Sequence, residues 1–192
     1  METPLNEIQI RNNQTKKLLL YFAMISMVMM FAGLTSAVIV SSSRRDWLQD
    51  FNLPSAFWWS TLVIIISSFT FHFAWKGIQK GNRGITTQLL LLTLVLALTF
   101  VLLQFQGFNQ IIANGFYFTG SNSTITTSFI YMIVLLHLLH LAGGVIAILI
   151  IIYNHFKQKY NTTQHIGIEL GSIFWHFLGI LWILLFLFLY FY

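Results

Sequence analysis

Cysteine is missing from all 192 residues of the chain, and charged residues make up only 8% of them. The absence of cysteine excludes disulfide bonds, thiolate metal sites and cysteine nucleophiles. An ordinary soluble domain has about 25% charged residues, whereas this chain is 57% hydrophobic and 17% aromatic. A soluble fold of this size could not bury so much apolar surface, so the composition predicts a membrane protein.

Residue patterns typical of catalysis and of transport are also missing. The sequence has no phosphate-binding loop, no Ser-His-Asp set and no pair of carboxylates. No Lys, Arg, Asp or Glu lies in the middle of an apolar run, whereas transporters and pumps normally keep a charged relay near mid-membrane. If the chain belongs to an enzyme, we therefore expect another subunit to carry the active site.

Five apolar runs are long enough to cross a membrane as helices. A bilayer core of about 30 Å requires about 20 apolar residues, and the runs cover about 17–40, 57–76, 86–107, 128–153 and 171–191. A helix satisfies its own backbone hydrogen bonds in lipid, and these runs are too continuous for barrel strands. The first run is too long for a signal peptide and no cleavage site follows it, so we expect it to be retained. The sequence thus predicts an all-α polytopic membrane protein, a bundle of five transmembrane helices in a single membrane domain over residues 1–192.

The positions of the basic residues predict the orientation of these helices. If the N-terminus is cytoplasmic, the same side receives Arg11, Lys16, Lys17, Lys76, Lys80, Arg83, Lys157 and Lys159. Only Arg44 and Arg45 then fall outside, and the other outer loop, 108–127, has no charge. Cytoplasmic loops of membrane proteins carry an excess of Lys and Arg. The bias predicts a cytoplasmic N-terminus and an outside C-terminus, and it accounts for the net charge of +5 without a nucleic-acid partner.

Two histidines lie in the fourth run, where polar residues are costly. His137, His140, Gly144 and Ala147 share one stripe at helical spacing, and Gly143 with Ala147 forms a small-xxx-small pair. The histidines could ligate a metal or haem, or they could form interhelical hydrogen bonds within a packed seam. We favour the seam because both side chains lie on the same side of one helix, whereas a bis-histidine haem needs ligands that face each other.

The fifth run also begins with polar residues. Glu169, Ser172, His176 and Gly179 share a face near its predicted cytoplasmic end. Glu169 has two interpretations: a carboxylate that caps the helix N-terminus, where the dipole favours negative charge, or a group that exchanges protons or docks a partner. His72 aligns with hydroxyl side chains of the second run, and such polar stripes usually pack helices together.

Small residues and methionines complete the set of candidate positions. Gly33 and Ala37 lie one turn apart in the first run and permit close helix packing. Thioether sulfur binds cuprous copper in some proteins, yet the methionines of the first run have no histidine or cysteine beside them. We therefore predict no metal site in this chain and a packing face on each of the five helices.

Two stretches in the last two runs resemble subunit III of haem-copper oxidases, the cytochrome c oxidase subunit III family. They are residues 131–144, YMIVLLHLLHLAGG, and residues 165–182, HIGIELGSIFWHFLGILW. The first resembles the family's H-x-L-H followed by a glycine-containing seam, and the second resembles its H-x-G-x-E segment followed by W-H-F. The resemblance covers most of the chain, from about residue 17 to the end.

The resemblance implies a five-helix short form that lacks the first pair of helices found in many members. Such a chain is expected to lie in a bacterial cytoplasmic membrane, to pack with other oxidase subunits on the flank of catalytic subunit I, and to bind no haem or copper itself. The haems and copper are then expected in partner subunits, and structural phospholipid against the helices. The implied roles are stabilisation of subunit I and support of proton uptake, to which we assign Glu169 and His165. The alternative is a membrane cytochrome subunit that ligates haem b through His137, His140 or His176.

Two positions depart from the family pattern. Met27 stands where many members have a membrane-embedded glutamate, and Gly179 stands where many have an acidic residue two places after W-H-F. Mechanisms that require those carboxylates fail in this chain, which favours a role in packing or assembly.

Overall fold

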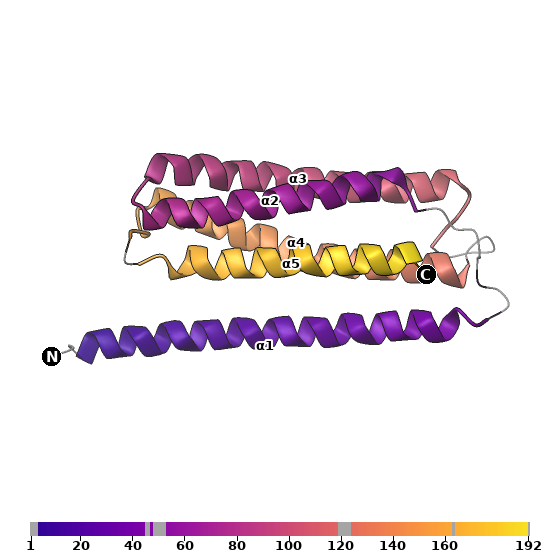
Figure 1. Cartoon of the computed structure of the whole chain (residues 1–192), viewed down its shortest axis with the longest axis horizontal. Coiled ribbons are helices and arrows are strands. Elements are labelled where there is room, and N and C mark those ends of the chain that lie inside the picture. The colour runs from indigo at the N-terminus through magenta and orange to yellow at the C-terminus, as the bar shows by residue number, and fades with distance from the viewer. Residues whose placement is uncertain (1–3, 45–46, 48–52, 119–123, 163, 192) are drawn as a thin grey trace.

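The computed structural model describes residues 4–44, 47, 53–118, 124–162 and 164–191, and this part of the chain forms five helices (Figure 1). Their bounds are α1 Pro4–Ser41, α2 Ser55–Gln79, α3 Arg83–Ala113, α4 Ile125–Phe156 and α5 Ile166–Phe191. All five are long and apolar enough to span a membrane, which confirms the predicted all-α polytopic fold. Each predicted span lies within one helix, and every helix except α5 extends beyond its apolar run at both ends.

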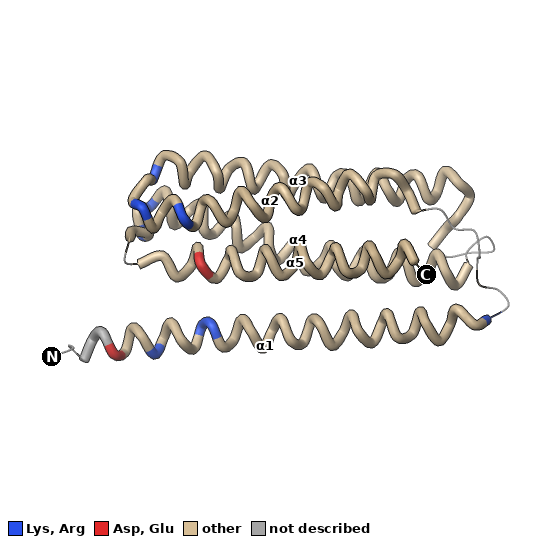
Figure 2. The backbone as a smooth tube through the Cα atoms, viewed as in Figure 1, with Lys and Arg blue, Asp and Glu red and all other residues tan. Residues whose placement is uncertain are grey.

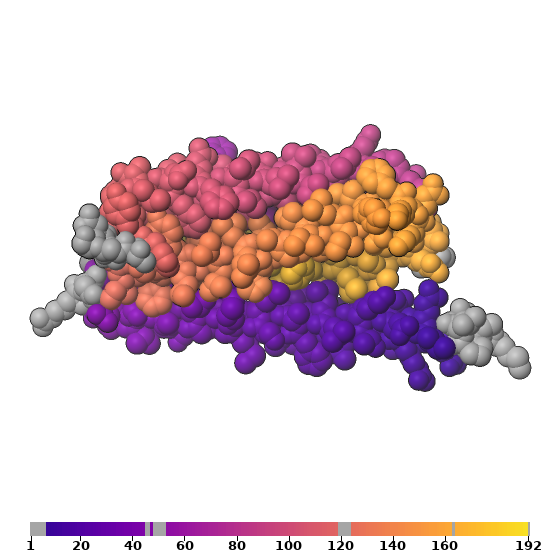
Figure 3. Space-filling view, turned by 180° about the vertical axis from the view of Figure 1, so that it is seen from behind, coloured from indigo at the N-terminus to yellow at the C-terminus, as the bar shows by residue number. Residues whose placement is uncertain are grey.

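Helices α2 to α5 form a compact bundle, and α1 lies along one side of it (Figures 1 and 3). Helix α2 contacts α3 and α5, and α4 contacts the same two helices. Within the described residues, α1 contacts only α4 and α5. Only 11% of the most apolar stretch of α1 is buried, compared with 28–44% in the other four helices. Most of the α1 surface is therefore left to lipid or to a partner.

Among the described residues, the Lys and Arg residues other than Arg44 gather toward one end of the molecule, which we call the basic end (Figure 2). The N-terminal part of α1, the turn between α2 and α3, and the segment between α4 and α5 bring their Lys and Arg residues to the same end. Arg44 lies at the opposite end, whereas Arg45 and residues 119–123 of the uncharged loop fall outside the described residues. This separation agrees with the charge bias of the sequence, and the side of the membrane that each end faces stays a prediction.

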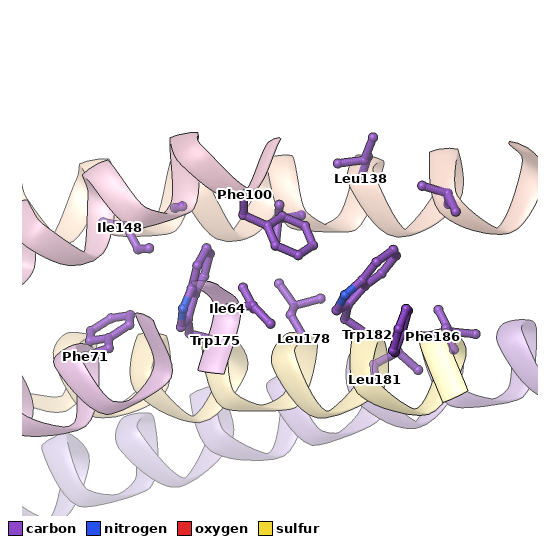
Figure 4. Close-up of a cluster of buried hydrophobic side chains, with 14 of the residues drawn as sticks. Ile64, Phe71, Phe100, Leu138, Ile148, Trp175, Leu178, Leu181, Trp182 and Phe186 are labelled. Atoms are coloured by element: carbon purple, nitrogen blue, oxygen red, sulfur yellow. The ribbon is translucent and has the colours of Figure 1, made fainter. Parts of the chain in front are cut away.

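The core of the bundle is organised around α5. Trp175 and Trp182 are 1% and 0% exposed and point from α5 into the space between the helices (Figure 4). The Trp175 indole Nε1–H donates to Ser67 Oγ at 3.0 Å, and the Trp182 Nε1–H donates to Thr61 Oγ1 at 3.0 Å. A buried indole N–H needs such an acceptor, so the hydroxyl groups of α2 fix α5 against α2.

Hydroxyl and amide groups also join α2 to α3. Gln104 Nε2 donates to Ser60 Oγ at 2.8 Å, and the hydroxyls of Thr70 and Thr93 lie 2.9 Å apart. All four of these residues are buried. Because lipid provides no competing hydrogen-bond partners, polar contacts of this kind hold membrane helices in one register.

Candidate polar sites in the helix bundle

An ion pair connects α1 to α5 at the basic end. Lys17 Nζ lies 2.5 Å from Glu169 Oε1, with the two side chains 38% and 23% exposed. Glu169 lies within the first turn of α5, as predicted, but its carboxylate is paired with a second helix. Sequence reasoning counted Lys17 only as a sign of orientation, because nothing in its spacing links it to a residue 152 positions later.

A cavity of about 280 Å³ lies against this ion pair, and both of its side chains line the cavity. Asn13 and Gln14 of α1 line it together with the ion pair and His165. The backbone carbonyl of His165 accepts hydrogen bonds from the N–H groups of Ile168 and Glu169, so this residue caps the N-terminus of α5, which begins at Ile166. The His165 Nδ1 atom is buried and has no hydrogen-bond partner among the described residues. The structure thus brings His165 and Glu169 together in one polar cavity.

The segment after α4 closes the basic end beside this cavity. Arg83 Nη2 donates to the backbone carbonyl of Tyr160 at 2.8 Å. Burial raises the pKa of Tyr160, although a hydrogen bond with the Asn154 side chain acts in the opposite direction. The Tyr160 hydroxyl is therefore neutral at physiological pH and contributes no charge at this end.

His137 is fully buried in an aromatic box. Its ring centroid lies 6.4 Å from that of Phe31, 6.2 Å from Phe100 and 5.2 Å from Trp182, so three other helices surround it. Neither ring nitrogen has a hydrogen-bond partner in the described part of the chain. The packed seam is present, but the interhelical hydrogen bond that we expected from His137 is not formed.

His140 lies one turn from His137 in a different environment. It is half-buried, and its Nδ1 lies 2.7 Å from the carbonyl oxygen of Leu136 in its own helix. A carbonyl only accepts hydrogen bonds, so Nδ1 carries the proton in this geometry. Through Nδ1, His140 therefore bonds within its own helix and not across to a neighbour, although its ring lies 5.8 Å from that of Phe31.

The structure instead pairs His72 of α2 with His176 of α5. Their ring centroids lie 5.8 Å apart at one end of a groove between the two helices. The groove has a volume of about 330 Å³, and Ser68 and Gly179 lie further along it. Sequence reasoning placed these histidines in separate stripes, because periodicity within one helix does not show which helix lies beside it.

The predicted packing residues differ in their surroundings. A Cβ atom added to Gly144 would lie 2.8 Å from Leu178 Cδ1, and one added to Gly179 would lie 3.0 Å from Ser68 Oγ. Gly33 and Gly143 are exposed, with no atom of another helix within 4 Å of that position. Gly144 and Gly179 thus permit close contacts inside the bundle, whereas Gly33 and Gly143 face outward. Ala37 and Ala147 of the predicted packing set are half-buried, and so is Met27, which stands where many family members have a glutamate.

These clusters contain no group of three or more His, Asp or Glu side chains that could hold a metal ion, within the residues that the structure describes. Their ion pairs, hydrogen bonds and ring contacts join helices to one another. Together with the five spanning helices, they define a polytopic helical membrane protein.

Comparison with known proteins assigns the family. The model of the family described as "Cytochrome c oxidase subunit III" matches residues 16–192. The chain is 32% identical over 185 residues to the cytochrome bo(3) ubiquinol oxidase subunit 3 of Buchnera aphidicola subsp. Schizaphis graminum, covering 94% of this chain and 95% of that protein. It is 30% identical over 146 residues to the cytochrome c oxidase subunit 3 of Petromyzon marinus, covering 74% of this chain and 51% of that protein.

The chain belongs to the cytochrome c oxidase subunit III family. It is a multi-pass membrane protein of this family, and the two relatives above are subunits of a cytochrome bo(3) ubiquinol oxidase and of a cytochrome c oxidase. It spans about half the length of the Petromyzon marinus relative and nearly the whole of the Buchnera one. This membership confirms the resemblance in the last two helices and favours the oxidase interpretation over a haem b cytochrome.

Proposed function

We propose that this chain is the non-catalytic flanking subunit of a respiratory oxidase in a bacterial cytoplasmic membrane. It packs against catalytic subunit I, which holds the haems and copper and reduces oxygen to water. The sparsely covered α1, which contacts only α4 and α5 among the described helices, supports a docking role. The concentration of basic residues at one end supports a cytoplasmic N-terminus.

The chain also supports proton uptake from the cytoplasmic side. The observation that carries this role is the cavity in which Glu169, His165 and Lys17 meet at the basic end. A carboxylate and an imidazole that are both partly exposed can exchange protons with water. Glu169 is also the only acidic residue after Asp50 in the sequence, so the last four helices contain no other carboxylate that could replace it.

The variant Glu169→Gln tests this role in the assembled oxidase complex. It keeps the size of the side chain and removes the group that takes up a proton. We expect an unchanged haem spectrum, together with a loss of sustained turnover that grows as the pH rises and protons become scarce. Unchanged turnover over repeated cycles at high pH would remove Glu169 from proton uptake.

Lys17→Gln is the matched control, because it breaks the same ion pair and keeps the carboxylate. A proton role predicts that Lys17→Gln retains turnover at high pH. Equal losses in the two variants, with recovery in the charge-swapped pair K17E/E169K, would show that the ion pair serves only to dock α1. The pair is partly exposed, so its contribution to stability is small, about 0–1 kcal/mol.

A further inference from the structure

Two histidines from different helices meet in the groove between α2 and α5. The ring centroids of His72 and His176 lie 5.8 Å apart, and both side chains are half-buried. Neither imidazole forms a side-chain hydrogen bond with any described residue. Unpaired polar groups are costly at membrane depth and are normally satisfied by a neighbour. The pair therefore offers ring nitrogens from two helices to a ligand in the groove.

The separation of the two rings suits one metal ion bound between them. A bond of about 2.0–2.1 Å between a metal and an imidazole nitrogen places the metal about 3.2 Å from the ring centroid. Two imidazoles on one ion then have centroids about 5.2 Å apart at a tetrahedral angle and about 6.4 Å apart in a linear arrangement. The 5.8 Å between His72 and His176 lies between these limits and corresponds to an angle of about 130° at the metal. At this spacing one ion can bridge both rings when a nitrogen of each is turned toward it.

The surroundings favour an ion of low charge and low coordination number. The groove has no Asp or Glu among the described residues that line it, and apart from the histidines and Ser68 its walls are Gly179 and apolar side chains. The cost of taking an ion out of water rises with the square of its charge, so neutral imidazoles alone stabilise a divalent ion poorly here. Copper binds imidazole nitrogen, and its cuprous form carries a single charge and is stable with two or three ligands.

We propose that His72 and His176 form a binding site for one cuprous ion, which joins α2 to α5. Each imidazole supplies one nitrogen, and a water molecule or the hydroxyl group of Ser68 takes a third position in the groove of about 330 Å³. The prediction of no metal site considered ligands within one apolar run, whereas this pair comes from two helices. The site depends only on the packing of α2 against α5. It is independent of the copper expected in partner subunits and of any role of Glu169 in proton uptake.

Lys76 distinguishes a cation from an anion as the ligand of this groove. It is exposed and follows His72 by four residues, so both side chains lie on the same face of α2, about 6 Å apart along its axis. Its positive charge repels a bound cation and attracts a bound anion. Lys76→Gln should therefore bind the cuprous ion about threefold more tightly than the wild type. Weaker binding in this variant would overturn the proposal.

The test titrates the purified full-length chain in mild detergent with cuprous ion, under anaerobic and reducing conditions, in competition with a coloured cuprous chelator. The chain has no cysteine that would bind the ion elsewhere. We expect one ion per chain, bound more weakly by about tenfold or more in His72→Phe and in His176→Phe. His176→Met replaces the imidazole by a thioether, which also binds cuprous copper, and should recover most of the affinity. The control variant His140→Phe lies outside the groove and should bind as the wild type does.

X-ray absorption at the copper edge provides a second test that leaves the wild-type chain unchanged. Scattering from two imidazole rings, with copper–nitrogen distances of about 2 Å, supports the site. A spectrum with sulfur ligands alone overturns it, because it would place the ion at the methionines of α1. Equal cuprous binding in the wild type, His72→Phe and His176→Phe would also overturn the proposal, and so would a wild-type chain that binds no ion.

Discussion

The substitution Gly144→Ala provides a direct test of the packing between α4 and α5. The added Cβ would lie 2.8 Å from Leu178 Cδ1 and 3.1 Å from Trp175 Cζ3. Leu178 is 0% exposed, and Trp175 is held by its hydrogen bond to Ser67. Neither side chain can move aside without disturbing the core. Gly143→Ala is the matched control, because it adds the same atom to the adjacent residue on the exposed face, where nothing lies within 4 Å.

The magnitude follows from two opposing effects. Alanine stabilises a helix interior relative to glycine by about 0.5–1 kcal/mol, and both variants gain this amount. Overpacking a well-filled core costs about 1–3 kcal/mol, and only Gly144→Ala incurs this cost. The propensity effect cancels in the comparison, so Gly144→Ala should unfold with a free energy about 1–3 kcal/mol lower than that of Gly143→Ala.

The measurement is equilibrium unfolding of the purified full-length chain in mild detergent, titrated with SDS and followed by tryptophan fluorescence. The isolated chain is preferable to the complex, because a partner that covers the face of Gly143 would add a cost to the control. Equal unfolding free energies, or a less stable Gly143→Ala, would refute the assignment of Gly144 to the α4–α5 contact and of Gly143 to the surface.

The same titration tests two further contacts. Ser67→Ala leaves the buried indole N–H of Trp175 without an acceptor and should lower the unfolding free energy by about 1–3 kcal/mol. Adding Trp175→Phe should recover part of this loss. A decrease of less than about 0.5 kcal/mol in Ser67→Ala would contradict the predicted cost. His137→Phe keeps an aromatic ring and removes two unpaired nitrogens, so the unfolding free energy should stay the same or rise. His137→Ala opens a cavity and should lower the unfolding free energy by about 2–5 kcal/mol. A large loss in His137→Phe would show that its nitrogens have partners.

The number of helices was predictable from the sequence because the apolar runs that cross a bilayer are long and separated by polar segments. The residues at which the helices begin and end were less predictable. Helix α1 begins at Pro4, about 13 residues before its apolar run, because a helix can continue into polar sequence such as that around Arg11 and Asn12. Hydropathy locates the part of a helix that lies in lipid and contains no information about where the backbone stops being helical.

The pairing of polar residues was not predictable from their spacing. Helical periodicity placed His72 and His176 on defined stripes, but the pair exists only because α2 lies beside α5. The same holds for Lys17 and Glu169, which meet because α1 contacts α5. Gly143 and Gly144 both appeared suited to packing, and the rotation of α4 about its axis decides which one faces the core. Neighbours and rotations are set by the sum of many side-chain contacts, which a single sequence pattern does not contain.

The position of α1 has a consequence for how the protein is made. Phe31 contacts His137 and Lys17 pairs with Glu169, so the contacts that hold α1 join residues more than 100 positions apart. During synthesis α1 enters the bilayer before α4 and α5, and its docking surface is complete only after α5 has been inserted. Phe31 can contact α4 before then, but Lys17 has no ion-pair partner until α5 is in place. Docking of the first helix is therefore a late step in the biogenesis of the subunit, and a nascent chain that stops before residue 169 carries α1 without its ion-pair partner.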